Sequence, residues 1–107
     1  MLADINFSML EGKVVGNVHE TTTDNGDRAM NFTIETQTGK GKFHCHSVVL
    51  WNTFIDKFKD KVQNGAFVRV EGFLQPSTLN YVDSEGRAKT LSYDRLNVRF
   101  IAMDEEY

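Results

Sequence analysis

The sequence has little of several residue types that would fix its class at once. Its one cysteine, Cys45, cannot form a disulfide within the chain and fits a reducing compartment. No apolar run approaches the roughly 20 residues of a membrane-spanning helix. The N-terminal MLADINFSML also lacks a basic segment followed by a long apolar core, as a secretion signal would have. We therefore expect a cytoplasmic protein.

An excess of basic residues is also missing, which argues against a polyanionic ligand. The chain has 12 Lys and Arg against 15 Asp and Glu, a net charge of −3. Three of the acidic residues, Asp104, Glu105 and Glu106, stand together near the C-terminal end, and the remainder has 12 charges of each sign. The placement of the basic residues then becomes decisive. Six of them are candidate phosphate contacts or ordinary solvated charges: Lys13, Arg28, Lys40, Lys42, Arg87 and Lys89.

The alternation of apolar and polar residues predicts five strands in one domain, residues 1–103, followed by a short acidic end, residues 104–107. The strands are expected at residues 9–18, 29–36, 44–51, 67–74 and 95–103. Asn25-Gly26 predicts a tight turn before the second strand, and Pro76 is expected to end the fourth. Residues 79–82 and 89–92 flank a polar turn, DSEGRA, and predict a projecting hairpin.

One helix is predicted between the third and fourth strands, at residues 52–62. Asn52 is a suitable N-cap, and Asn64-Gly65 is expected to end the helix with a left-handed cap. Four apolar residues recur at helical spacing and form one stripe: Phe54, Ile55, Phe58 and Val62. We expect four phenylalanines in the core: Phe32, Phe54, Phe58 and Phe100.

This order of elements predicts an all-β fold with one helix. Three strands, a helix and two further strands with a hairpin between them are the order of a five-stranded OB-fold, a Greek-key barrel. The alternative is another small α+β domain with a meander and one helix.

Metal and catalytic sites are not indicated. His44 and His46 form a His-x-His pair, but no third ligand completes a zinc site. Cys45 points to the opposite strand face, so it is poorly placed to act with either histidine. Gly39 and Gly41 match no phosphate-binding loop. We expect no metal, no cofactor and no enzymatic activity.

Residues 8–103 resemble the bacterial and mitochondrial single-stranded DNA-binding protein family. The similar pieces occur in the family's order: VVGNV in the first strand, Asn25-Gly26 before NFTIET, His46 followed by VVLW, VEG after the helix, a DSEGR turn and YDRLNV. The resemblance implies an OB-fold that binds single-stranded DNA with little sequence preference, through base stacking and phosphate contacts.

The resemblance also implies roles for individual residues. Trp51 stands where the family has a base-stacking aromatic residue, and Tyr81 stands near its stacking tryptophan in the projecting hairpin. Asn17 belongs to the matching GN pair of the first strand, and His46 matches a histidine near the subunit interface. Phe73 is either an aromatic residue at the rim of the ligand face or a subunit contact.

The chain departs from the family at several binding positions. Cys45 and Ser47 stand where the family has a tryptophan and an arginine, and the hairpin segment QPSTLNY has no basic residue. The long tail with an acidic tip is also missing. The end formed by Asp104, Glu105, Glu106 and Tyr107 is either a shortened partner-binding tip or a solvated end. These departures predict weaker DNA binding, a smaller site or a different ligand path.

Two functions remain open at this point. The first is a homo-oligomer, a tetramer or dimer, that coats single-stranded DNA in replication, recombination or repair, together with proteins of those processes. Such a protein would be associated with the nucleoid, or with the host cytoplasm if encoded by a phage. The second is an OB-fold adaptor, similar to primosome proteins, that binds protein partners and binds DNA weakly or not at all.

Overall fold

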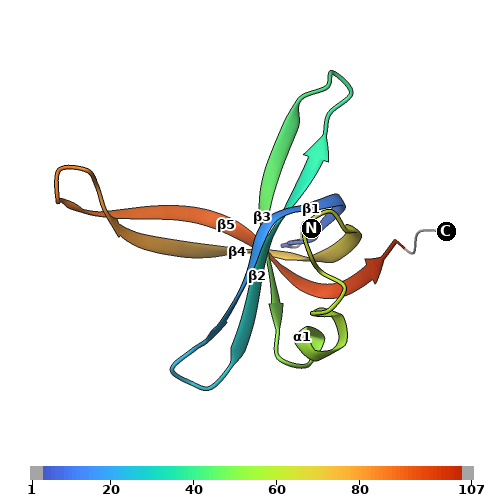
Figure 1. Ribbon diagram of the computed structural model, residues 1–107, viewed down its shortest axis with the longest axis horizontal. Coiled ribbons are helices and arrows are strands. Elements are labelled where there is room, and N and C mark those ends of the chain that lie inside the picture. Colours follow the sequence, from blue (N-terminus) through green and yellow to red (C-terminus); the bar gives the residue numbers. More distant parts are fainter. Residues whose placement is uncertain (1–3, 105–107) are drawn as a thin grey trace.

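The computed structural model describes residues 4–104 as five strands and one short helix (Figure 1). The elements are, in chain order, β1 (Ser8–Thr22), β2 (Arg28–Gln37), β3 (Phe43–Trp51), α1 (Thr53–Phe58), β4 (Phe67–Val82) and β5 (Ala88–Met103). No helix in this described part is long and apolar enough to cross a membrane.

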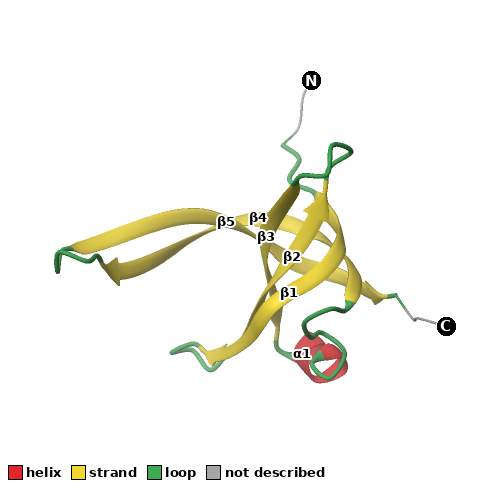
Figure 2. Ribbon diagram, turned by 45° about the horizontal axis from the view of Figure 1, so that its top comes forward, coloured by secondary structure: helices red, strands yellow, loops and turns green. Residues whose placement is uncertain are grey.

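The strands close into a barrel in the order β1-β2-β3-β5-β4 (Figure 2). The long β1 closes it, because its first residues pair with β4 and its later residues pair with β2. β3 and β5 are parallel, and all other neighbours are antiparallel. With α1 between β3 and β4, this is the predicted OB-fold.

The alternation of β2 packs the barrel interior as expected. Met30, Phe32 and Ile34 are buried, and they join one core cluster with residues from every strand and from α1. Its remaining members are Val14, Val48, Leu50, Ile55, Val62, Val68, Val70, Leu96, Val98 and Ile101. Phe54 and Phe58 are only partly buried and pack against this cluster.

The fourth strand does not end before Pro76, so this prediction was wrong. β4 continues to Val82 and pairs with β5 over its whole length, including Pro76 opposite Asp94. Beyond Gly72, β4 has lost β1 as its second neighbour, and a proline is tolerated where one side of a strand is open. The two strands therefore project from the barrel as the predicted hairpin, called the arm below (residues 76–94; Figure 1).

A β-bulge in β5 overturns the prediction that Phe100 belongs to the core. Gly72 pairs with Val98 but Glu71 pairs with Phe100, which leaves Arg99 as an extra residue. The extra residue reverses the alternation, so Phe100 is 50% exposed whereas Ile101 is 6% exposed. Gly72 is required here, because a Cβ at its position would lie 1.9 Å from the carbonyl oxygen of Asn97.

The helix is shorter than predicted and begins differently. α1 ends at Phe58, and Gly65, with φ 95°, lies in the following turn and donates its N–H to the carbonyl of Val14. Asn52 precedes the helix with φ 50° and ψ −115°, and its side chain forms no hydrogen bond to the helix. Asn52 thus stands at the predicted N-cap position, but its side chain does not cap the helix, because the tertiary contacts described below bind it.

Candidate nucleic-acid interface

Two aromatic rings on the outside of the barrel each lie beside an arginine. The guanidinium of Arg95 is 5.5 Å from the centroid of the Trp51 ring, and that of Arg99 is 5.2 Å from the Phe73 ring. β5 positions these groups, because Leu96 and Val98 point into the core and their neighbours Arg95, Asn97 and Arg99 must point outward. We call Trp51, Phe73, Arg95 and Arg99 the outer-face cluster.

Amide side chains connect this cluster to adjacent strands. Arg95 donates from Nη1 to Oδ1 of Asn31 on β2, at 3.2 Å. Asn97 donates from Nδ2 to Oε1 of Gln75 on β4, also at 3.2 Å. These partners are neutral, and neither Arg95 nor Arg99 forms an ion pair within residues 4–104. The positive charge of both arginines is therefore available to an anionic ligand.

A cleft of about 470 Å³ opens beside Trp51. It is lined by Asp27, Trp51, Asn52, Thr53, Phe54, Gln75, Asn97, Val98 and Arg99. The indole Nε1–H of Trp51 is buried without a hydrogen-bond partner among the described residues. Amide, carboxylate and cationic groups thus surround an aromatic surface, which suits a ligand that combines flat rings with negative charge.

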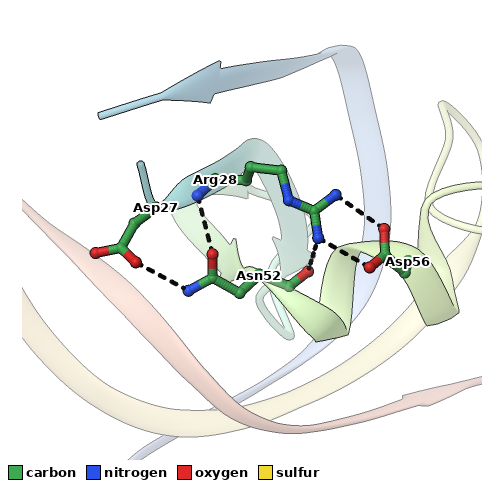
Figure 3. Close-up of polar contacts among 4 residues, drawn as sticks. All are labelled: Asp27, Arg28, Asn52 and Asp56. Atoms are coloured by element: carbon green, nitrogen blue, oxygen red, sulfur yellow. Dashed lines mark hydrogen bonds and ion pairs between the residues drawn. The ribbon is translucent and has the colours of Figure 1, made fainter. Parts of the chain in front are cut away.

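The structure pairs two of the predicted phosphate contacts with carboxylates. Arg28 forms a bidentate ion pair with Asp56, in which Nη1 donates to Oδ1 at 2.9 Å and Nη2 donates to Oδ2 at 2.8 Å (Figure 3). The hydrogen bond raises the pKa of Arg28 and lowers the pKa of Asp56. Arg87 forms an exposed ion pair with Glu85 at 3.2 Å. Each of these two arginines therefore already has a carboxylate partner, with which a phosphate would compete.

The predicted lysines are exposed but do not gather around Trp51. Lys40 and Lys42 lie in the turn between β2 and β3, which projects on the side opposite α1 (Figure 1). Lys89 lies on the arm opposite Tyr81, whose ring is 45% exposed. Lys13 lies on β1, where it pairs with Glu35 of β2. These lysines could contact a long DNA strand only at points that are separate from Trp51 and from one another.

Asn17 lies at the edge of the outer face. It occurs where the register of β1 shifts between Val15 and His19. Together with Asn31 and Tyr93 it lines a small hollow of about 140 Å³. Since Asn31 also contacts Arg95, Asn17 and the outer-face cluster belong to one continuous surface.

His46 lies elsewhere, at a groove of about 840 Å³ at the base of the arm. Its Nε2 is 3.0 Å from Oγ1 of Thr36. The groove is mostly apolar and is lined by Ser8, Met9, Leu10, Cys45, His46, Ser47, Leu74, Leu79, Leu91, Tyr93, Asp94 and Leu96. Several of its apolar side chains are strongly exposed, including Met9 at 50% and Leu79 and Leu91 at 52% each.

The predicted partner-binding end is described only at its first residue. Asp104 donates its backbone N–H to the carbonyl of Phe67 at 3.0 Å. Glu105, Glu106 and Tyr107 lie outside the described residues.

Sequence reasoning missed Arg95 and Arg99. It sought phosphate contacts mostly in or next to turns, whereas these two lie within strand β5. The signal was present in DRLNVR, where polar residues alternate with Leu96 and Val98. Outward-facing cations opposite a buried apolar row would have pointed to this face.

A closed five-stranded barrel with aromatic and cationic side chains on its outer face defines an OB-fold binding protein. The chain belongs to the Single-strand binding protein family, whose model matches residues 5–100. This confirms the resemblance seen in the sequence, and proteins of this class bind rather than catalyse.

A structure of a PriB domain is among the solved structures that share this fold. It is the dimeric N-terminal domain of the PriB protein from Thermoanaerobacter tencongensis, with a TM-score of 0.70 and 19% sequence identity. The similarity covers 94% of this chain and 98% of that one. A search of curated proteins finds no match.

Proposed function

We propose that this protein binds single-stranded DNA with little sequence preference and protects exposed strands in replication, recombination or repair. The observation that carries the proposal is the outer-face cluster: two aromatic rings lie on one face with two arginines that form no ion pair among the described residues. Membership of the Single-strand binding protein family supports it. The cellular site we propose is the cytoplasm, in association with the nucleoid or within a phage-infected host.

The chemistry of the cluster explains binding without sequence readout. Every base has a flat π-face, so stacking on Trp51 or Phe73 does not depend on base identity. Arg95 and Arg99 lie close to the same rings and can contact the phosphates between stacked bases. The stacking energy and the phosphate attraction therefore act at adjacent nucleotides.

The remaining predicted contacts would extend this path. Tyr81 and Lys89 on the arm offer a second aromatic and cationic pair. Asn17 could form a hydrogen bond to the DNA strand at the hollow that it lines with Asn31. Because the chain carries a net charge of −3, affinity should depend on these few local cations and should fall steeply with salt.

We also propose that the protein acts as a homo-oligomer. The exposed apolar groove beside His46 supports this, since monomers rarely leave such surfaces open. The PriB domain, which has a similar fold, is a dimer. Light scattering on the free protein tests the proposal, and a mass equal to one chain of 12.2 kDa would reject it.

The decisive test is a titration with oligo-dT at several salt concentrations, followed by the fluorescence of Trp51. We expect quenching on binding and an affinity that falls with salt, because Trp51 is the single tryptophan. Phe43→Ala is a suitable control, since this exposed aromatic lies at the other end of β3. Absence of binding even at low salt would favour the adaptor function instead.

A further inference from the structure

We infer that Asn52 and Arg28 are positioning residues for Trp51: their hydrogen-bonded bridge fixes the strand end that presents the indole ring. The inference deepens the proposed function and rests on it where DNA affinity is measured. It also changes the role of Arg28, which the sequence suggested as a phosphate contact. The bridge joins the start of β2 to the junction between β3 and α1 (Figure 3).

The backbone of Asn52 is the first observation. Among the described residues, Asn52 is the one non-glycine with positive φ, at 50° with ψ −115°. This conformation favours glycine, because a Cβ crowds the backbone there. An asparagine at this position therefore needs compensating interactions, and its side chain must supply something that glycine would not.

The hydrogen bonds of Asn52 show what compensates. Its Oδ1 accepts from the backbone N–H of Arg28 at 3.0 Å, and its Nδ2 donates to Oδ1 of Asp27 at 3.4 Å. Its backbone N–H donates to the carbonyl of Arg28 at 2.9 Å. The residue directly after Trp51 is thus bound to β2 through both its backbone and its side chain.

Arg28 closes the bridge from the other side. Its guanidinium donates to the carbonyl of Asn52 at 3.3 Å and binds both carboxylate oxygens of Asp56 in α1. Hydrogen bonds around Asn52 therefore connect three elements: β2, the end of β3 and the first turn of α1. The cleft beside Trp51 is lined by Asp27 and Asn52, so the bridge forms one wall of the proposed ligand site.

Asn52→Gly is the informative variant. Glycine accepts the positive φ without strain and keeps the backbone hydrogen bonds, but it removes both side-chain bonds. We therefore expect the variant to fold with a melting temperature close to that of the wild type. In the free protein, acrylamide should quench Trp51 fluorescence more strongly than in the wild type, because the ring is less fixed.

DNA binding provides the second measurement. We expect Asn52→Gly to weaken oligo-dT binding about threefold to tenfold, as part of a stacking contribution is lost. The dependence of affinity on salt should not change, since no phosphate contact is removed. In a Trp51→Ala background, Asn52→Gly should cause no further loss, because the two residues act through one contact.

Asn64→Gly is the matched control. Asn64 also bridges to a strand, since its Oδ1 accepts from the N–H of Gly16 at 3.0 Å, but Asn64 does not line the Trp51 cleft. The Asn64→Gly substitution should leave acrylamide quenching and DNA affinity unchanged. Unchanged quenching in Asn52→Gly would overturn the inference. It would also be overturned if Asn52→Gly weakened DNA binding in the Trp51→Ala background as much as it does in the wild type. If the wild type bound no DNA, the proposed function would fail, and the quenching measurement would still decide the role of Asn52.

Discussion

The guanidinium of Arg95 lies 5.5 Å from the centre of the Trp51 ring, across the junction where β3 and β5 run parallel. This contact has two consequences for a ligand. It orients the ring by a cation–π interaction, and it places a positive charge next to any base that stacks on the ring. The two residues should therefore differ in how their loss affects binding.

Trp51→Ala should weaken oligo-dT binding by about 1–3 kcal/mol, the usual contribution of one stacked base. Because the fluorescent residue is removed, affinity must be measured with a dye-labelled oligonucleotide, for example by anisotropy. Phe43→Ala removes an aromatic ring that is 58% exposed at the opposite end of β3, and it should have no comparable effect. Equal affinity of wild type and Trp51→Ala would exclude stacking on this residue.

Arg95→Gln should reduce the salt dependence of binding as well as its strength. A single lost phosphate contact lowers the slope of log affinity against log salt by about 1. Glutamine retains a donor toward Asn31, so the change tests charge rather than the hydrogen bond. Arg28→Gln is the comparison, and its slope should equal that of the wild type, because Asp56 already neutralises this arginine.

The ion pair between Arg28 and Asp56 should make stability depend on acidic pH. The hydrogen bond from Arg28 lowers the pKa of Asp56 below its ordinary value of 3.8. A carboxyl whose pKa is lower in the folded state stabilises that state above the unfolded pKa, and this stabilisation is lost as pH falls through the folded pKa.

The measurement for this pair is urea unfolding of wild type and Asp56→Asn at neutral pH and below pH 3.8. The wild type should be the more stable protein at neutral pH, and the difference should shrink at the acidic pH. A difference that stays constant with pH would show that the ion pair does not cause it.

The sequence was sufficient for most of the fold because alternation is a local signal. Met30, Phe32 and Ile34 lie in the core as their spacing predicts, and Asn25-Gly26 lies in the turn between β1 and β2. Pro76 was misjudged because its effect depends on whether a second strand pairs with that part of β4.

The candidate site was less accessible to sequence reasoning because it depends on contacts between distant residues. Arg28 and Asp56 are 28 positions apart, so their pairing appears only in the fold. Asn52 looked like a helix cap, and its bond to the N–H of Arg28 arises from the β2–β3 pairing. Trp51 could be proposed as a stacking residue because it ends a predicted strand and matches an aromatic position of the family, and its role stays a prediction.

Gly72→Ala should destabilise the protein by about 2 kcal/mol or more, since a Cβ there overlaps the carbonyl oxygen of Asn97 at 1.9 Å. The overlapping atom belongs to the backbone, so no side-chain rotation can relieve it. Gly39→Ala is the matched control, because its Cβ would meet nothing within 4 Å, and it should change stability little. Both are measured by thermal or urea unfolding, and similar stabilities for the two variants would contradict the close approach at Gly72.

The bulge at Arg99 makes a final prediction about two neighbouring residues. Simple alternation after Leu96 and Val98 would bury Phe100 and expose Ile101, whereas the structure does the reverse. Ile101→Ala should therefore cost about 2–5 kcal/mol of unfolding free energy, as expected for a large residue removed from a core. Phe100→Ala should cost less than about 1 kcal/mol, because half of its surface already contacts water. Urea unfolding of the two variants compares them directly, and a larger loss for Phe100→Ala would show that β5 continues into the barrel without the bulge.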